Sequence, residues 1–178
     1  MAALIDAARA PDYPAEVVLV LSDRSDAGGL ALARGAGIAT AAIDPKIYAG
    51  RDEVDAAMQA LLEIHRIDLI CLAGFMRILG ASFVNRWRGR LINIHPSLLP
   101  AFPGLDTHAR AIAAGVAEHG CTVHFVEPEV DSGPIIAQAR LAIMPGESAE
   151  GLAARVLALE HVLYPAALSR VASGRAKP

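Results

Sequence analysis

The central segment of the chain reads Leu91-Ile92-Asn93-Ile94-His95-Pro96-Ser97-Leu98-Leu99-Pro100. It is an apolar run that carries an asparagine and a histidine two residues apart and is stopped by a proline. Because residues i and i+2 of a strand point to the same face, we expect Asn93 and His95 to project together. One is an amide donor and the other a titratable donor. Such a pair suits a site that holds an oxygen becoming negative during a reaction.

Buried strands with helices between them continue in both directions from this segment. Residues 17–21 are a continuous apolar run, typical of a strand buried on both faces, and residues 67–73 predict a second buried strand. Residues 38–43 form a shorter strand-like run. Helical patterns lie between the strands, at residues 2–10, at residues 30–34 behind a Ser25 or Asp26 cap, and at residues 51–66, 81–87 and 108–114.

The pattern changes in the last third of the chain. Residues 121–126 and 135–143 are strand-like and are joined by a link containing the turn Asp131-Ser132-Gly133-Pro134, which predicts an antiparallel pair. A long helix follows, in which Pro165 is expected to be an interruption. The apolar stripe of that helix is Leu152, Val156, Leu159 and Leu163.

Alternating strands and helices predict an α/β fold. We expect a doubly wound, mostly parallel sheet with helices on both faces, Rossmann-like, with an antiparallel strand pair near the C-terminus. Sheets of this kind bind ligands beyond the carboxyl ends of their strands. Residues 74–77 and 93–95 both lie at such ends, so we expect them to be neighbours.

Composition limits the classes of partner. With 178 residues, the chain is expected to be a single domain over residues 1–178. A net charge of −3 gives no reason to expect a nucleic-acid partner, and no stretch reads as a membrane span. Cys71 and Cys121 lie in apolar runs, so free buried thiols in a cytoplasmic protein are expected, not a disulfide. A monomer and a homodimer both fit the sequence.

Each candidate site residue also has a structural interpretation. A lone histidine near a strand end is most often structural, but Asn93 and the proline-rich loop favour a functional His95. Asp131 is either a turn residue or a loop carboxylate that approaches His95 and keeps it protonated, and spacing leaves both open. His108, His119 and His124 match no zinc-site spacing, so structural roles and no metal are expected.

These motifs resemble the phosphoribosylglycinamide formyltransferases, also called GAR transformylases, of purine synthesis. The resemblance runs from Met1 to about Gly174, with the motifs in the family's order. It rests on residues 93–100 with Pro103-Gly104-Leu105-Asp106-Thr107-His108 after them, on Ala73-Gly74-Phe75-Met76-Arg77-Ile78-Leu79, on Asp131-Ser132-Gly133-Pro134-Ile135-Ile136, and on Glu160-His161-Val162-Leu163-Tyr164-Pro165.

The resemblance implies transfer of a formyl group from 10-formyltetrahydrofolate to the amine of glycinamide ribonucleotide. It implies that Asn93 and His95 hold the formyl oxygen, with His95 as proton donor and Asp131 as its carboxylate partner. Glu160 is implied to bind hydroxyls of the ribonucleotide. The residues implied to hold the reduced folate are Arg51, Met76, Arg77, Ile78, Leu79, Asn93, Glu127, Pro128, Glu129, Val130 and Asp131.

The chain departs from the family pattern at Asp106, where the family often has histidine, and at Leu159, where it usually has glutamine. It begins with a helical pattern where the family has a strand and a glycine-rich phosphate loop, so we expect such a strand and loop upstream of Met1. The alternatives are a catalytically impaired folate-binding fragment, a formyltetrahydrofolate deformylase, or a methionyl-tRNA formyltransferase, for which the chain has no basic surplus.

Overall fold

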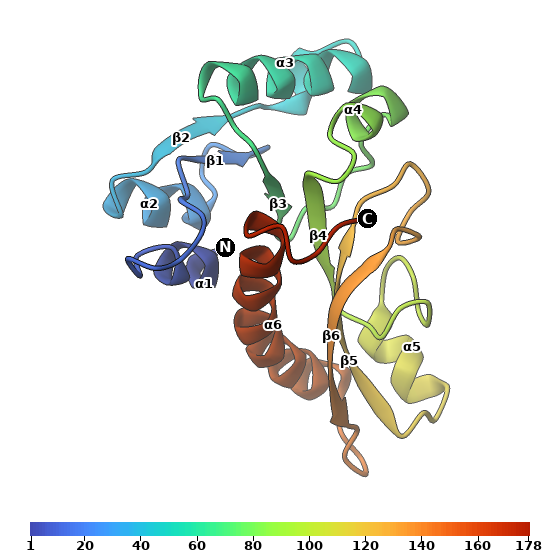
Figure 1. The fold of residues 1–178 in the computed structure, drawn as a ribbon. Helices are drawn as coiled ribbons and strands as arrows, with labels where there is room; N and C mark the ends of the chain where they lie inside the picture. Colours follow the sequence, from blue (N-terminus) through green and yellow to red (C-terminus); the bar gives the residue numbers. More distant parts are fainter.

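A computed structural model describes all 178 residues as an α/β fold (Figure 1). Helices and strands alternate along most of the chain, as predicted. In chain order the elements are α1 (Ala2–Ala7), β1 (Leu19–Ser22), α2 (Gly28–Gly35), β2 (Ala39–Ala42), the 3₁₀ turn η1 (Pro45–Ile47), α3 (Arg51–Ile64), β3 (Ile70–Leu72), α4 (Ala81–Arg86), β4 (Leu91–His95), α5 (Thr107–Ala113), β5 (Glu118–Phe125), β6 (Ile135–Ala142) and α6 (Ala149–Ala172).

The strands form two sheets. In one, β1 and β2 pair in parallel, and in the other the order is β3-β4-β5-β6. The β3–β4 pair is parallel, whereas β4–β5 and β5–β6 are antiparallel. The α/β class and the antiparallel pair are therefore confirmed, and β5 is antiparallel to β4 as well.

Strands β1 and β3 are less buried than their apolar sequences predict. All residues of both strands are only partly buried, so the expectation of strands covered on both sides is wrong for them. The reason is the topology, because each strand is an edge of its own sheet and the two edges share no hydrogen bonds. Both strands are also shorter than residues 17–21 and 67–73. The strand expected upstream of Met1 stays a prediction.

Strand β4 is covered on both faces, and this fixes where its polar residues point. Leu91 packs in a cluster with Phe83 and Trp87 of the α4 region. Its neighbour Ile92 packs in a different cluster with Leu168, on α6. Because side chains alternate along a strand, Asn93 and His95 share the face of Leu91. Figure 1 shows α6 running along β5 and β6 on its own side of the sheet.

Two local expectations about helices are wrong. Neither Ser25 nor Asp26 caps α2, whose N-cap is Ala27 without a side-chain bond, because Asp26 is paired with Arg24 at 3.0 Å. Pro165 does not interrupt α6, which continues to Ala172. A proline removes one backbone hydrogen bond from a helix. In α6 the helix packs against the sheet, and the Tyr13 hydroxyl donates a 2.7 Å hydrogen bond to the Pro165 carbonyl.

Helix α6 is also long and apolar enough to cross a membrane, by length and composition alone, so the expectation that no stretch reads as a span is wrong on that criterion. Its Leu152, Val156 and Leu168 are buried in the clusters formed with the sheet. The apolar composition of α6 is therefore explained by core packing in this fold.

Both cysteines are free, as predicted. Burial raises the pKa of Cys71 and of Cys121 to about 12. A thiol with so high a pKa stays protonated and is a poor nucleophile at neutral pH, so neither cysteine belongs to the reactive groups of the chain.

Candidate active site

The carboxyl ends of β3 and β4 lie side by side and present the polar residues predicted from the sequence. Leu72 is the register partner of Asn93, so the loop that begins at Ala73 leaves the sheet beside Asn93. Gly74 turns this loop with a φ of +63°, a left-handed conformation that glycine adopts without strain. Residues 74–77 and 93–95 are therefore neighbours, as expected.

His95 is buried, at 6% exposure, and both of its ring nitrogens face oxygen acceptors. Nε2 lies 3.0 Å from the Phe102 carbonyl oxygen. Nδ1 lies 3.4 Å from Oδ2 of Asp131. A carbonyl and a carboxylate only accept hydrogen bonds, so each ring nitrogen of His95 faces an acceptor for a ring N–H.

Asp131 combines the two roles that the sequence left open. It is a turn residue with a φ of +53°, and its carboxylate points back to the end of β4. Oδ2 accepts a 2.8 Å hydrogen bond from the Gly104 N–H, and Oδ1 lies 3.6 Å from Nε2 of His124. One carboxylate thus holds the loop after β4 and places negative charge beside two buried imidazoles.

The loop between β4 and α5 is held by side chains at both ends. The Ser97 hydroxyl donates to the Ala101 carbonyl, and the Thr107 hydroxyl donates to the Pro96 carbonyl at 2.8 Å. Arg110 donates to the carbonyls of Pro103 and Leu105. These bonds hold the Phe102 carbonyl close to the His95 ring. Asp106, one of the departures from the family pattern, is the N-cap of α5 with a φ of +55° and no side-chain cap.

The loop after β3 presents apolar side chains outward. Met76 is 81% exposed and Ile78 is 63% exposed, whereas Leu79 is buried in the cluster that contains Leu91. The loop ends at Gly80, whose N–H donates a 2.7 Å hydrogen bond to the buried carboxylate of Asp55. The loop is anchored by the buried Leu79 and by the Gly80–Asp55 hydrogen bond, and its exposed side chains are apolar. Such a surface suits a flat ring better than a charged ligand.

Two further sequence-predicted regions border that loop. Arg51 is the first residue of α3, and its guanidinium lies beside Gly80 at the end of that loop. A β-carbon added to Gly80 would be 3.8 Å from the Arg51 Nε. Val126 packs against the same cluster as Leu79, so the segment from Glu127 to Asp131 starts beside it. Glu127 is paired with Arg88 at 2.9 Å, while Pro128, Glu129 and Val130 are exposed.

Glu160 lies on a different side of the strand ends from Asp131. It lines a cavity of about 270 Å³ together with Met1, Gly74, Ile94 and Tyr164. Burial raises the pKa of the Glu160 carboxyl. The Tyr164 hydroxyl donates to the carbonyls of Leu72 and Ile92 and so ties α6 to the same strand ends. A half-buried carboxylate beside a cavity can accept hydrogen bonds from ligand hydroxyls.

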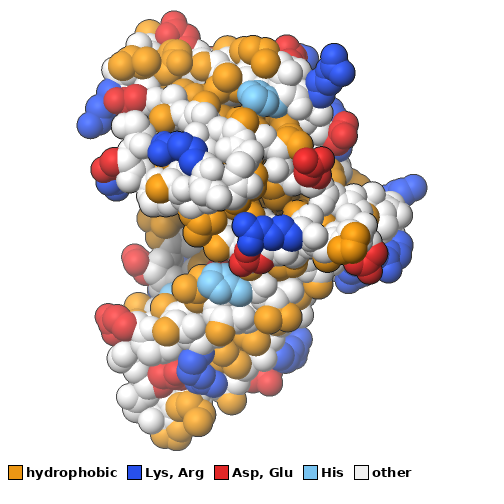
Figure 2. Space-filling view, turned by 90° about the vertical axis from the view of Figure 1, so that its left-hand side faces the viewer, with side chains coloured by type: hydrophobic (Ala, Val, Ile, Leu, Met, Phe, Trp, Pro, Cys, Tyr) orange, Lys and Arg blue, Asp and Glu red, His pale blue; other side chains and the backbone are white.

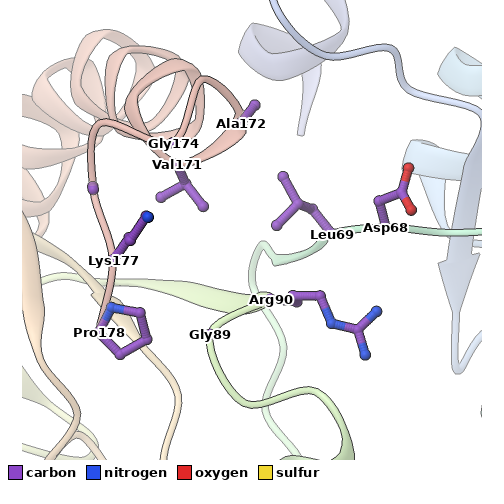
Figure 3. A pocket seen from close by; sticks show the side chains of 10 residues that line it. Asp68, Leu69, Gly89, Arg90, Val171, Ala172, Gly174, Lys177 and Pro178 are labelled. Atoms are coloured by element: carbon purple, nitrogen blue, oxygen red, sulfur yellow. The ribbon is translucent and has the colours of Figure 1, made fainter.

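A second cavity, of about 300 Å³, lies at the other end of the sheet (Figure 3). Its labelled residues come from the segments before β3 and β4 and from the C-terminal end, among them Asp68, Arg90 and Lys177. Open α/β sheets bind ligands beyond the carboxyl ends of their parallel strands, here β3 and β4, so the chemistry is expected at the Glu160 side. Figure 2 shows hydrophobic side chains gathered across the middle of the displayed face of the molecule, with positive and negative side chains scattered over that face.

His108 and His119 form a pair in which His119 is buried and His108 is partly buried. Nε2 of His119 lies 3.2 Å from Nδ1 of His108, and Nδ1 of His119 has no hydrogen-bond partner. Burial lowers the pKa of both imidazoles, and each lies near another histidine that lowers it further. No group of three or more His, Cys, Asp and Glu side chains could hold a metal ion.

We expect the free energy of unfolding to fall as the pH drops below about 6.5, the ordinary pKa of histidine. Below that pH the histidines of the unfolded chain bind protons. In the folded chain His108, His119 and His124 have lowered pKa values, so they bind protons only at a lower pH. The loss should level off below the folded pKa values. Urea unfolding at successive pH values measures it. His119→Phe should flatten the dependence more than His65→Phe at the C-cap of α3, and equal effects would contradict this explanation.

His124 is the one residue of the cluster that sequence reasoning placed only as structural. It is 2% exposed, pairs with Asn93 across the β4–β5 ladder and contacts Asp131. The only sequence signal was its position in a strand-like run, because the register of β5 against β4 is not visible in the sequence.

Comparison with known proteins places the whole chain in one family. The family model described as formyl transferase matches residues 1–168. The phosphoribosylglycinamide formyltransferase of Escherichia coli is 44% identical over 175 residues, which cover 98% of this chain and 82% of that protein. The human trifunctional purine biosynthetic protein adenosine-3 is 47% identical over 172 residues, 97% of this chain. The chain spans only 17% of the length of that protein.

Solved structures agree with these relatives. Phosphoribosylglycinamide formyltransferase from Brucella melitensis superposes with a TM-score of 0.92 at 53% identity, covering 97% of this chain and 88% of that one. Glycinamide ribonucleotide transformylase 1 from Symbiobacterium toebii superposes with a TM-score of 0.95 at 45% identity, covering 98% and 82%.

Proposed function

The chain belongs to the formyl transferase family, and from this premise we propose that it transfers a formyl group from 10-formyltetrahydrofolate to the amine of glycinamide ribonucleotide, a step of purine biosynthesis. The observation that carries the proposal is the cluster of Asn93, His95 and Asp131 at the carboxyl end of β4. The relatives of this chain that are named for this activity match nearly its whole length.

In the proposed reaction the ribonucleotide amine forms a bond to the formyl carbon, whose oxygen takes up the electron pair. The bond from that carbon to the folate nitrogen then breaks, the folate nitrogen gains a proton and the former amine loses one. Asn93 and His95 supply N–H groups to the oxygen while it is negative. The Nε2–H of His95 donates to the Phe102 carbonyl in the free chain, so the formyl oxygen has to replace that carbonyl. Asp131 balances the charge of the imidazolium.

The two substrates are assigned to two sides of the strand ends. We assign the folate ring to the surface formed by Met76, Ile78 and Val130, which are exposed apolar residues of the two loops beside Leu79. Covering such side chains with a flat ring removes apolar surface from water. We assign the ribonucleotide hydroxyls to Glu160 in its cavity.

Isothermal titration of the protein with each ligand separately tests this assignment. We expect glycinamide ribonucleotide and a 10-formyltetrahydrofolate analogue each to bind. Binding of the folate analogue alone would favour a folate-binding protein without turnover and would contradict the proposed transferase. Glu160→Gln should weaken ribonucleotide binding and leave folate binding unchanged.

Arg77→Ala is expected to weaken binding of the folate analogue while ribonucleotide affinity stays within about twofold. Arg77 follows Gly74 in the loop at the end of β3, and loss of a hydrogen bond from a charged donor typically costs about 1.5–3 kcal/mol. The dissociation constants of both ligands measure the effect, with Arg34→Ala on α2 as the control. A selective loss of ribonucleotide affinity would move Arg77 to the other pocket.

A further inference from the structure

His124 lies directly opposite Asn93 in the antiparallel β4–β5 ladder. Residues opposite each other in such a pair share a face of the sheet, and the two side chains meet there. Nδ2 of the Asn93 amide lies 3.3 Å from Nε2 of His124. The imidazole of His124 is 2% exposed, so water does not compete for this contact.

The backbone around His124 is irregular at this point. Val123 pairs with Ala137 of β6, but His124 pairs with Ile135, so Ile136 is an extra residue in the ladder. Such a bulge changes the local twist and redirects side chains, and bulges are frequent beside active sites. The irregularity coincides with the residue that contacts Asn93.

The tautomer of His124 follows from its other contact. Nδ1 lies 2.8 Å from the carbonyl oxygen of Phe125, which only accepts hydrogen bonds, so Nδ1 carries a proton. In the neutral ring Nε2 then has a free lone pair and accepts from Asn93. Burial lowers the pKa of His124, the Phe125 carbonyl and Asp131 oppose that, and His95 adds to it.

We infer that His124 is the positioning residue for Asn93. Its Nε2 accepts one N–H of the Asn93 amide, which turns the nitrogen and not the oxygen of that amide toward the ring and leaves the second N–H for the substrate oxygen. The inference deepens the proposed function and rests on it, because Asn93 needs this orientation only if it stabilises a negative oxygen.

Protonation of His124 would reverse this orientation. Nε2 would become a donor facing Oδ1 of Asp131, 3.6 Å away, and the Asn93 amide would have to present its oxygen to the ring. The groups that face His124 are Asn93 and His95 from β4, Asp131 from the loop after β5, and the Phe125 carbonyl. Asn93 therefore loses its donor toward the substrate when His124 gains a proton.

Nitrogen-15 NMR of the unliganded, full chain tests the geometry without any substrate. At pH 8 we expect the His124 ring to show a protonated Nδ1 and an unprotonated Nε2. On lowering the pH, the Asn93 side-chain amide protons, assigned with Asn93→Ser, should shift with the same midpoint as the His124 ring. A protonated Nε2 at pH 8, or Asn93 resonances that do not follow His124, would overturn the inference whether or not the protein transfers formyl groups.

Kinetics of His124 variants test the consequence. His124→Leu removes the acceptor and should lower kcat on the order of 10²-fold, as expected for a misplaced oxyanion donor, with both KM values within about twofold. His124→Gln, whose side-chain oxygen can accept near the Nε2 position, should recover at least about tenfold of that loss. His65→Leu is the control. Equal losses in the Leu and Gln variants would overturn the positioning role, whereas an inactive wild-type chain would instead refute the proposed function.

Discussion

His95→Ala is expected to lower kcat for formyl transfer by about 10²–10³-fold, the usual cost of removing one donor to a developing oxyanion. His95 is buried at the end of β4 with both ring nitrogens turned to oxygen acceptors, so it is built to donate. Asn93→Ala should cause a loss of the same order, because the amide is the second donor on the same strand face. Initial rates with both substrates saturating measure the effect.

Folding has to be checked separately, because His95 is also buried. His95→Asn keeps a side chain that can donate one hydrogen bond and should fold as the wild type does. The thermal unfolding midpoints and the circular dichroism spectra of the variants control for misfolding. Near-normal turnover of folded His95→Ala or Asn93→Ala would refute the assignment of that residue.

Asp131→Ala is expected to have the second-largest effect, a reduction of kcat of roughly 10–10²-fold, from the loss of hydrogen bonds and charge worth about 1.5–3 kcal/mol. The carboxylate holds the Gly104 N–H at 2.8 Å and faces both His95 and His124. Its removal frees the loop after β4 and takes away the negative charge that faces the two imidazole rings.

Asp131→Asn separates these two roles. The asparagine oxygen can still accept from Gly104, so the loop should stay ordered, but the negative charge is lost. If the charge matters, Asp131→Asn should lose most of the activity that Asp131→Ala loses. Full activity in Asp131→Asn together with a loss in Asp131→Ala would reduce Asp131 to a loop anchor. Limited proteolysis of the loop between β4 and α5 reports on its order in each variant.

The sequence predicted the centre of the fold well. Strand β4 spans Leu91–His95, as expected, because an apolar run stopped by Pro96 leaves little freedom in where a strand ends. The alternation of Asn93 and His95 on one face followed from the strand period alone. Helix ends were less certain, as Asp26 shows, because a nearby arginine competes with the backbone for its carboxylate.

The contacts that complete the site could not be read from the sequence. His124 meets Asn93 through the register of β5 against β4, next to a bulge at Ile136 of β6, and register depends on the whole sheet. The Phe102 carbonyl reaches His95 because Ser97, Thr107 and Arg110 hold the loop. Pro165 was expected to interrupt a helix, but α6 continues through it to Ala172.

Transfer of an isotopic label tests the central claim most directly. The protein is mixed with glycinamide ribonucleotide and 10-formyltetrahydrofolate carrying carbon-13 in the formyl group, and the products are followed by NMR. The account predicts that the label appears in a formamide on the ribonucleotide amine, at a rate that His95→Ala lowers by about 10²–10³-fold. Release of the label as free formate, or formation of the formamide at the same rate in His95→Ala, would contradict it.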